Sequence, residues 1–450
     1  KCAALPLDLE SGWKIVCDAM NKFVAYQSNP PLIWEGFRVA AKASDFSVMT
    51  LTVENPVLVA ARRASRPENQ ERPTWMPPEQ FFRPIKYVTL KVTNGCNLKC
   101  SYCNVEADLP STPRMSIETF KRIATVCIEN ATATQLGLEF HGGEPLLFPD
   151  EWFGEAVGFA QALATKHGKK LEHPMQTNGT RLTEQRYDYL RSLGICIGIS
   201  CDGPPEINDE YRMAGNRVEQ AIRLILSKKR GFGMVLVLSR ANCHKMHAVM
   251  EYFQGLGVPG FRLNFLQPQG LGLEHTLLSG EEMFNGVKGI FDHMAETECA
   301  VLEDTVKILV TRFAYGRIKN PPLSCWELQC QAGRTYCAVN LHGDVFSCGT
   351  DMSKHRLGHI DDGFDLEHTD ETLCSLHKKD AWYARCFGCN AHRICALSCP
   401  TSHYNEPNYR DSECDYTRRF YTYMHENPEK VFRVLSGIRR REPESFTPLP

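Results

Sequence analysis

The chain has 450 residues, of which 43% are hydrophobic and 10% aromatic, so it can bury a large core and divide into about two or three domains. Lys and Arg (51) nearly balance Asp and Glu (53), so the composition gives no support for binding nucleic acid or an anionic membrane surface. No apolar run reaches the length of a membrane span, and the first residues lack a signal-peptide pattern, which together predict a cytoplasmic protein.

The one unusual feature of the composition is the content of 20 cysteines. Dense disulfide frameworks belong mainly to short secreted chains, whereas this chain is long and begins without a secretion signal. Ligation of metal by thiolates explains the cysteines better. It also predicts a reducing compartment, because the ligands must be free thiolates.

Patterning along the chain predicts six segments. Prolines crowd one early stretch and interrupt helices and central strands there, so we expect a linker. A later stretch is rich in cysteine and lacks long periodic helices, so we expect a loop-rich domain organised by metal. The segments are an N-terminal extension (1–65), the linker (66–84), an α/β domain (85–290), bridging helices (291–324), the cysteine-rich domain (325–420) and a C-terminal helix with a solvated basic tail (421–450).

Within residues 85–290, six short β-like runs alternate with helical patterns. Ser116 is a candidate N-cap of one helix, and Gly194 and Gly257 are candidate stops of two others. Six such units predict parallel strands curled into a partial (β/α)6 barrel, with ligands at the carboxyl ends of the strands. The predicted strands are Ile85–Thr93, Leu136–Phe140, Leu171–Gln176, Cys196–Ser200, Gly233–Leu238 and Gly260–Leu266.

Directly after the first predicted strand, Cys96, Cys100 and Cys103 form a C-x3-C-x2-C motif. Three thiolates can bind three irons of a [4Fe–4S] cubane and leave one iron open. A structural zinc site is the alternative, but such sites close with four ligands and prefer C-x2-C pairs. The motif resembles that of the radical S-adenosylmethionine (SAM) superfamily, in which SAM chelates the open iron and is cleaved reductively to a 5′-deoxyadenosyl radical.

Motifs after later strands resemble further signatures of that family. His141–Pro145 would alone indicate only a turn, yet it resembles the GGEP motif, whose backbone and Glu hold the SAM amino group. The resemblance also places Ser200 at the ribose, Arg212 at the SAM carboxylate and Leu266 on the adenine. It therefore assigns SAM contacts to Tyr102, Gly142, Gly143, Glu144, Asn178, Ser200, Arg212 and Leu266.

The downstream cysteines resemble those of the SPASM domain, which carries two auxiliary [4Fe–4S] clusters. Eight interleaved thiolates exceed one tetrahedral zinc site. The resemblance implies two ligand sets: Cys325, Cys330, Cys348 and Cys399 for the first cluster, and Cys386, Cys389, Cys395 and Cys414 for the second. Cys337 is an alternative to Cys325, which is preferred because Cys337 lies in a predicted strand. The other cysteines are 2, 17, 127, 196, 201, 243, 299 and 374; we expect core thiols, with Cys127 and Cys196 on apolar faces.

SPASM-bearing radical SAM proteins mostly modify peptides or proteins. The resemblance thus implies a carbon–carbon, thioether or ether crosslink in a ribosomally made precursor peptide (RiPP maturation), a flavodoxin- or ferredoxin-type reductant, and a leader-binding role for residues 1–65. The alternatives are a sulfatase-maturing enzyme forming formylglycine, a small-molecule dehydrogenase and a non-catalytic iron–sulfur electron carrier. Sulfatase maturases usually place Asp directly after the cysteine matched by Cys348, whereas here the candidate base is the displaced Asp351.

Overall fold

The computed structural model divides into two units, residues 1–72 and residues 73–450. In the first unit, β1 (Arg38–Lys42) pairs antiparallel with β2 (Thr50–Glu54). The rest of the predicted extension, Cys325 and Asp351 lie outside the described residues. The described residues are 38–42, 50–54, 74–104, 113–229, 231–275, 277–315, 330–350, 352, 355–377, 386, 389–395, 399 and 407–442.

The second unit is built on a 12-stranded sheet, whose middle part confirms the predicted α/β core. Strands β4 to β9 are parallel and lie in chain order. The sheet does not close into a barrel, because β4 pairs with β11 on its other side and β9 pairs with β10. These strands are β4 (Tyr87–Thr93), β5 (Gln135–Gly142), β6 (Lys170–Thr177), β7 (Ile195–Ser200), β8 (Gly233–Leu238), β9 (Gly260–Phe265) and β10 (Leu302–Glu303).

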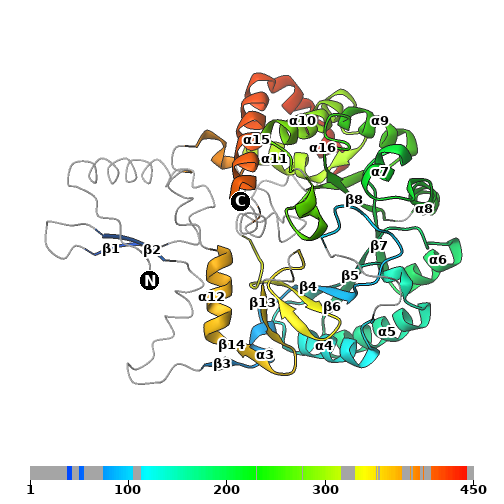
Figure 1. The fold of residues 1–450 in the computed structure, drawn as a ribbon, viewed down its shortest axis with the longest axis vertical. Coiled ribbons are helices and arrows are strands. Elements are labelled where there is room, and N and C mark those ends of the chain that lie inside the picture. The colour runs from blue at the N-terminus through cyan, green and yellow to red at the C-terminus, as the bar shows by residue number, and fades with distance from the viewer. Residues whose placement is uncertain are drawn as a thin grey trace. The chain divides into compact units, whose positions relative to one another are not determined.

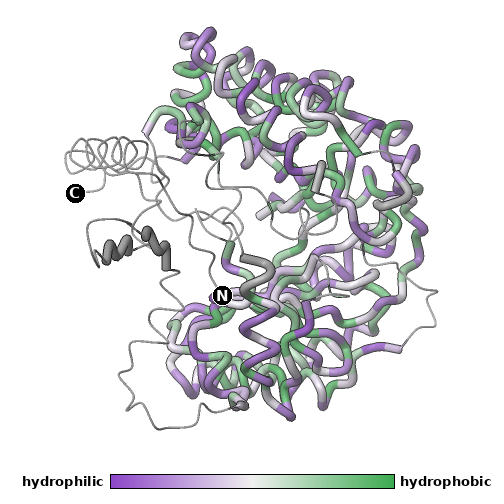
Figure 2. The backbone as a smooth tube through the Cα atoms, turned by 60° about the vertical axis from the view of Figure 1, so that its left-hand side comes forward, coloured by the Kyte–Doolittle hydropathy of each residue, from purple (hydrophilic) through white to green (hydrophobic). Residues whose placement is uncertain are grey.

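Amphipathic helices cover the outer face of this sheet, and hydrophobic and hydrophilic residues alternate along them (Figures 1 and 2). Ser116 caps α4 as predicted, because its side chain accepts a hydrogen bond from the Thr119 N–H. Gly257 ends α9 with a positive φ of 81°, which suits glycine. The elements are α4 (Ile117–Asn130), η2 (Pro145–Leu147), α5 (Asp150–Lys166), α6 (Glu184–Ser192), α7 (Pro205–Tyr211), α8 (Gly215–Ser227), α9 (Met246–Leu256), η3 (Gly270–Glu274), α10 (Gly280–Glu296) and α11 (Asp304–Tyr315).

The cysteine-rich region extends the same sheet. Its first strand, β11 (Tyr336–Asn340), runs parallel to β4, and an antiparallel series follows through β12 (Asp344–Phe346), β13 (Arg356–His359) and β14 (Gly363–Asp365). The helix α12 (Leu366–His377) shows that the expectation of no long helix in this region is wrong. A short η5 (Asn390–Arg393) follows.

Part of the proline-rich stretch is structured. The strand β3 (Trp75–Met76) pairs with β14 and forms the edge of the sheet, and α3 (Pro78–Phe82) begins with a proline at a position that needs no amide hydrogen. Phe81 is buried and stacks on Phe364 of β14, with ring centroids 4.2 Å apart. The predicted linker is thus joined to the cysteine-rich end of the sheet from residue 75 onward.

The C-terminal residues form two helices, α15 (Pro407–Glu426) and α16 (Pro428–Arg441), where the sequence predicted one helix and a solvated basic tail. The Arg441 guanidinium donates to the carbonyl oxygens of Ala300 (2.6 Å) and Pro259 (2.8 Å). The Arg439–Arg441 run is exposed, as predicted, but it ends a helix and does not form a tail, and its last arginine binds backbone carbonyls that follow α10 and α9. None of the helices in the described ranges is long and apolar enough to cross a membrane.

Candidate functional site

The cysteine loop, residues Cys96–Cys103, follows the carboxyl end of β4 and is held from several sides. The Glu144 N–H donates to the Gly95 carbonyl (2.9 Å), and the Ser101 N–H donates to the Tyr211 carbonyl (2.9 Å). The Leu271 N–H in turn donates to the Cys103 carbonyl (3.0 Å). Because these partners follow β5, end α7 and lie in η3, three separate elements fix the path of the loop.

The three thiols of the cysteine loop are half-buried and close enough to influence one another. The pKa of Cys96 is raised to about 11, mainly by burial, and the neighbouring Cys100 and Cys103 contribute to this rise. The Asn178 side-chain amide lies 3.8 Å from the Cys96 sulfur and can donate to it. Iron would displace the thiol protons, so three neighbouring cysteines fit three irons of a cubane.

Gly142 and Gly143 bring the end of β5 against the start of the cysteine loop. A Cβ atom on Gly142 would lie 2.2 Å from the Thr93 carbonyl oxygen, and one on Gly143 would lie 2.1 Å from the Gly95 carbonyl oxygen. Gly142 also has a φ of +130°, which disfavours any side chain. Both predicted contact residues are therefore glycine because two backbones approach closely here.

Glu144 is fully buried and joins β5 to the end of β6. Its carboxylate accepts hydrogen bonds from the Leu146 N–H (2.9 Å), the Asn178 N–H (2.8 Å) and the Thr177 hydroxyl (2.5 Å). Burial raises the pKa of Glu144, and these donors oppose that rise. A carboxylate has about four lone-pair positions, so it retains acceptor capacity for an ammonium group.

Tyr102 and Arg212, both predicted SAM contacts, meet at a carboxylate that the sequence did not single out as a site residue. The Arg212 guanidinium donates to the Tyr102 hydroxyl (2.7 Å) and pairs with Asp202 (3.7 Å), and the Tyr102 hydroxyl donates to Asp202. Met213 and Ala214 follow with φ of 74° and 59°, a strained backbone for residues with side chains. Asp202 thus positions Arg212 beside the cysteine loop.

The remaining predicted SAM contacts lie at the ends of β7 and β9. The Ser200 hydroxyl accepts a hydrogen bond from the Gln176 side chain (2.8 Å), and Leu266 is buried. Gln269, in the loop after β9, is 3% exposed, and neither polar atom of its side chain has a hydrogen-bond partner among the described residues. Sequence reasoning missed Gln269, because only its burial marks an amide in need of a partner.

Four cysteines from the second predicted ligand set line one pocket, which we call the outer cysteine pocket. Cys386, Cys389 and Cys395 come from the segment around η5, and Cys414 comes from α15. The pocket also has His392, Arg410, Asp411 and Arg418 in its wall. Burial raises the pKa of Cys414, while Arg410 and Arg418 oppose that rise. The donor set fits the four thiolate ligands of a [4Fe–4S] cluster.

The first predicted ligand set is described only in part. Cys330 and Cys348 pack in a small cluster with Ala332 and Tyr336, separate from the main core. Cys337 is fully buried in the main core instead, where burial and the nearby Cys127 raise its pKa. The structure thus places Cys337 apart from the Cys330–Cys348 pair.

Several other cysteines behave as predicted core thiols, with one exception. Cys127, Cys201, Cys243 and Cys299 are buried, but Cys196 is exposed, so its predicted place on an apolar face is wrong. Cys196 alternates with the buried Ile195 and Ile197 of β7 and lies on the other face of that strand.

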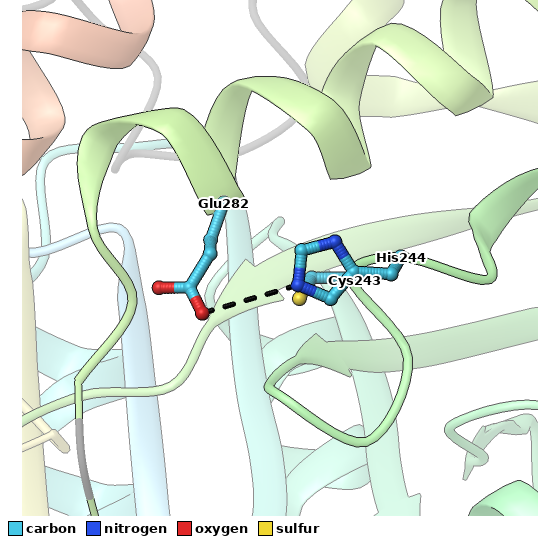
Figure 3. A group of neighbouring side chains, drawn as sticks. All are labelled: Cys243, His244 and Glu282. Carbon is cyan, nitrogen blue, oxygen red and sulfur yellow. Dashed lines mark ion pairs between the residues drawn. The ribbon is translucent and has the colours of Figure 1, made fainter.

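Among the described residues, Cys243, His244 and Glu282 form a group that could hold a metal ion (Figure 3). The carboxylate of Glu282 already accepts from the Ser279 N–H (2.8 Å) in the capping box of α10, and pairs with Arg240 (3.3 Å). These contacts account for Glu282 without a metal.

Comparisons with known proteins agree with this arrangement. Residues 90–238 match the radical SAM superfamily. The chain is 21% identical to a cysteine-type anaerobic sulfatase-maturating enzyme of Clostridium novyi, covering 78% of this chain and 97% of that protein. It is 24% identical to the antilisterial bacteriocin subtilosin biosynthesis protein AlbA of Bacillus subtilis, covering 70% of this chain and 65% of that one.

Two solved structures share the fold. Native anSMEcpe with bound AdoMet and the Cp18Cys peptide has a TM-score of 0.65 at 21% identity, covering 79% of this chain and 99% of that one. SuiB of Streptococcus suis bound to the precursor peptide SuiA has a TM-score of 0.51 at 13% identity, covering 76% and 82%.

Proposed function

This chain is an enzyme of the radical SAM superfamily, with its radical SAM domain at residues 90–238, and we propose that it modifies a peptide or protein by hydrogen abstraction. The product that we propose is a crosslink in a ribosomally made precursor peptide. The observation that carries this proposal is the combination of the cysteine loop with a second, separate set of cysteines gathered in the outer cysteine pocket.

Each part of the site has a proposed role. Cys96, Cys100 and Cys103 would hold the [4Fe–4S] cluster that, together with SAM, supplies a 5′-deoxyadenosyl radical when bound. Glu144 would accept the SAM ammonium group, and Arg212, held by Asp202, would pair with the SAM carboxylate. Asn178 would donate to the Cys96 thiolate, and the Leu266 side chain would pack on adenine. These groups orient SAM, and burial excludes water.

The relatives support a peptide or protein substrate. The chain spans almost the whole of a sulfatase-maturating enzyme and about two thirds of the subtilosin biosynthesis protein AlbA. Its fold is shared with anSMEcpe and SuiB, both of which were solved with a peptide bound.

One position supports crosslinking over formylglycine formation. The residue directly after Cys348, where sulfatase maturases usually carry Asp, is Gly349. A Cβ there would lie 3.0 Å from the Tyr336 hydroxyl and 3.4 Å from Thr89, so any side chain at this position requires the tyrosine to shift slightly. The base proposed for a substrate radical is then Asp351, two residues further on.

Formylglycine formation is the second candidate, because the chain covers 97% of the Clostridium novyi sulfatase-maturating enzyme. The products differ chemically. A crosslink removes two hydrogens from the peptide, one to deoxyadenosine and one as a proton, with the electron passed to an acceptor. Formylglycine made from cysteine also exchanges sulfur for oxygen, and it carries an aldehyde that hydroxylamine traps.

Anaerobic reconstitution tests the proposal. About twelve irons per chain would support three clusters, and about four would contradict both auxiliary clusters. With SAM, a reductant such as flavodoxin and candidate precursor peptides, we expect deoxyadenosine and a peptide lighter by two hydrogens that does not react with hydroxylamine. A product that reacts with hydroxylamine would show that the enzyme forms formylglycine and not a crosslink. Deoxyadenosine without any altered peptide, across both precursor peptides and sulfatase-derived peptides, would contradict a peptide substrate.

A further inference from the structure

The inner face of the sheet carries a group of polar side chains beside the cysteine loop. Thr89 of β4 pairs in register with Glu139 of β5, and Lys91 pairs with His141 two residues further along. Residues of the two strands that alternate with these, such as Leu90 and Phe140, are buried in the hydrophobic core under the helices. The four polar side chains therefore share the opposite, inner face.

Lys91 is only 4% exposed, yet its ammonium has few hydrogen-bond partners. The one described contact is to His141 Nδ1 at 3.4 Å, and that nitrogen also accepts from the Gly142 N–H at 2.8 Å. The backbone donor makes the shorter bond, and the long contact to Lys91 is weak. An ammonium has three donors, so this buried group is under-satisfied.

Glu139 lies close to Lys91 but makes no direct ion pair with it. Their opposite charges influence each other, and the neighbouring Arg262 acts on Glu139 as well. One Glu139 oxygen accepts from the Thr89 hydroxyl (2.6 Å), which also bonds to the Tyr336 hydroxyl (3.0 Å). Glu139, His141 and Tyr336 are all partly exposed, unlike the residues that alternate with them on the core side of the strands.

This group of polar side chains lies near cysteines of both regions. The charge of Lys91 is influenced by Cys103 of the cysteine loop and by Cys348 of the first auxiliary set. The polar group therefore lies near a thiol from each of the two regions, the one where a radical would be generated and the one where an auxiliary cluster would accept an electron.

We propose that Lys91 and Glu139 bind an amide group of the substrate, Lys91 donating to its carbonyl oxygen and Glu139 accepting from its N–H. This inference rests on the proposed peptide substrate. An amide bridges a donor and an acceptor that lie near each other without pairing, and it completes the hydrogen bonds of both. A substrate carboxylate fits less well, because it would face Glu139 and the cysteine thiolates.

Small amide probes test the inference with the reconstituted, dithionite-reduced holoenzyme. The probes are N-acetylglycine N-methylamide for a backbone peptide unit and propionamide for an Asn- or Gln-type side chain, with N,N-dimethylacetamide as an analogue that lacks the N–H. Paramagnetic broadening of the probe protons by the reduced clusters reports binding near the cysteine loop, and its concentration dependence gives a Kd.

The variants are Lys91→Met and Glu139→Gln. The matched controls are Lys86→Met, at the exposed position just before β4, and Glu172→Gln, at an exposed position of β6. We expect Lys91→Met to weaken the better amide probe about tenfold or more, because a charge-assisted hydrogen bond is lost. Glu139→Gln should remove the preference over dimethylacetamide. The controls should leave the Kd of the amide probe and its preference over dimethylacetamide unchanged. The amide probe that binds more tightly shows whether the substrate amide comes from the peptide backbone or from an Asn or Gln side chain.

Other results would overturn the inference. The inference is wrong if the probes bind the Lys91→Met, Glu139→Gln and parent enzymes with equal Kd values. It is also wrong if Lys91→Met keeps probe binding but shifts the reduction potentials of the clusters, because Lys91 would then act on the clusters. Should Lys91→Met fail to fold, Lys91→Gln gives the same comparison. Deoxyadenosine formation with SAM alone is measured in parallel, so failure of the radical chemistry is recognised separately from failure of the amide site.

Discussion

The cysteine loop and the outer cysteine pocket offer the same ligand atoms, but the chain holds them differently. The loop is bonded to residues after β5, at the end of α7 and in η3, and a side chain from the end of β6 approaches Cys96. Around the pocket, the described bonds are mostly local, such as Cys389 N–H to the Cys386 carbonyl and Cys395 N–H to the Ala391 carbonyl. The fold therefore shapes the first site in advance, and we expect bound metal to contribute more to the organisation of the second.

Removing a thiol from the cysteine loop has the largest expected effect. Cys100→Ala should reduce SAM-dependent deoxyadenosine formation by more than about 100-fold, because loss of a direct ligand exceeds the loss measured for outer partners of metal sites. The matched control is Cys196→Ala, at an exposed thiol on β7. Chromatographic quantification of deoxyadenosine measures this loss. Activity retained in Cys100→Ala would mean that this loop does not carry the cluster.

Removing a thiol from the outer cysteine pocket should separate the two regions. Cys414→Ala is expected to lower the iron content by about four per chain and to abolish the altered peptide. Formation of deoxyadenosine should stay within about twofold of the parent, because the cysteine loop draws no ligand from α15. Iron analysis and peptide mass spectrometry check this. A parallel collapse of deoxyadenosine formation would show that the two regions depend on each other.

Metal removal tests the difference in organisation directly. Hydrogen exchange of the reconstituted and the chelator-treated protein should show a large loss of protection over residues 386–395 and a small one over residues 96–103. The bonds from Tyr211 and Leu271 to the loop do not involve metal, so they persist. Equal loss of protection in both segments would contradict a preformed loop.

Features that depend on nearby residues in the chain could be predicted from the sequence, whereas contacts between distant segments could not. Strand positions, the Ser116 cap and the order of the parallel sheet followed from local patterns, because each depends on neighbours in the chain. The glycines of the β5 turn could be located, although the close approach to Thr93 and Gly95 that requires them could not. The pairing of β11 with β4 was not predicted, because it joins segments about 250 residues apart by backbone bonds that no side-chain pattern records.

The site residues divide in the same way. Cysteine spacing identified the ligand candidates, since few other chemistries need thiolates at those intervals. Asp202, Gln269 and the inner-face group of Lys91 and Glu139 were missed as site residues. Their significance comes from burial and from contacts across strands, and a charged or amide residue in a strand carries no sign of either.

A pH effect is expected from Glu303, which braces the start of α11 where the chain leaves the parallel sheet for the cysteine-rich region. Its buried carboxylate accepts from the Leu263 (2.7 Å), Thr305 (2.9 Å) and Val306 (2.6 Å) N–H groups. Burial nevertheless raises its pKa from 4.5 to about 7. Between these values the folded protein binds more protons than the unfolded one, so stability falls as pH rises through this window and is constant above it.

The size of this effect is roughly 3 kcal/mol between pH 4.5 and 8. Denaturant unfolding at several pH values should show this effect as a difference between the parent and Glu303→Gln. The substitution removes this part of the pH dependence of stability, and it also weakens the hydrogen bonds at all pH values. Glu172→Gln, at an exposed glutamate of β6, is the control. Identical pH profiles for the parent and Glu303→Gln would show that burial does not control this carboxyl.

The smallest expected effect concerns the C-terminal helix α16, which the sequence assigned in part to a solvated tail. Arg441 donates to the carbonyls of Cys299, Ala300 and Pro259, so it links the end of α16 to the segments after α10 and α9. These bonds are partly exposed to water, and we expect Arg441→Met to lower the free energy of unfolding by about 1 kcal/mol. Arg433→Met, at an exposed position of the same helix, should have no measurable effect.

Arg441→Met should also leave deoxyadenosine formation unchanged, because α16 contributes no group to the cysteine loop. A change in activity without a change in stability would connect α16 to the site by a route other than these carbonyl contacts.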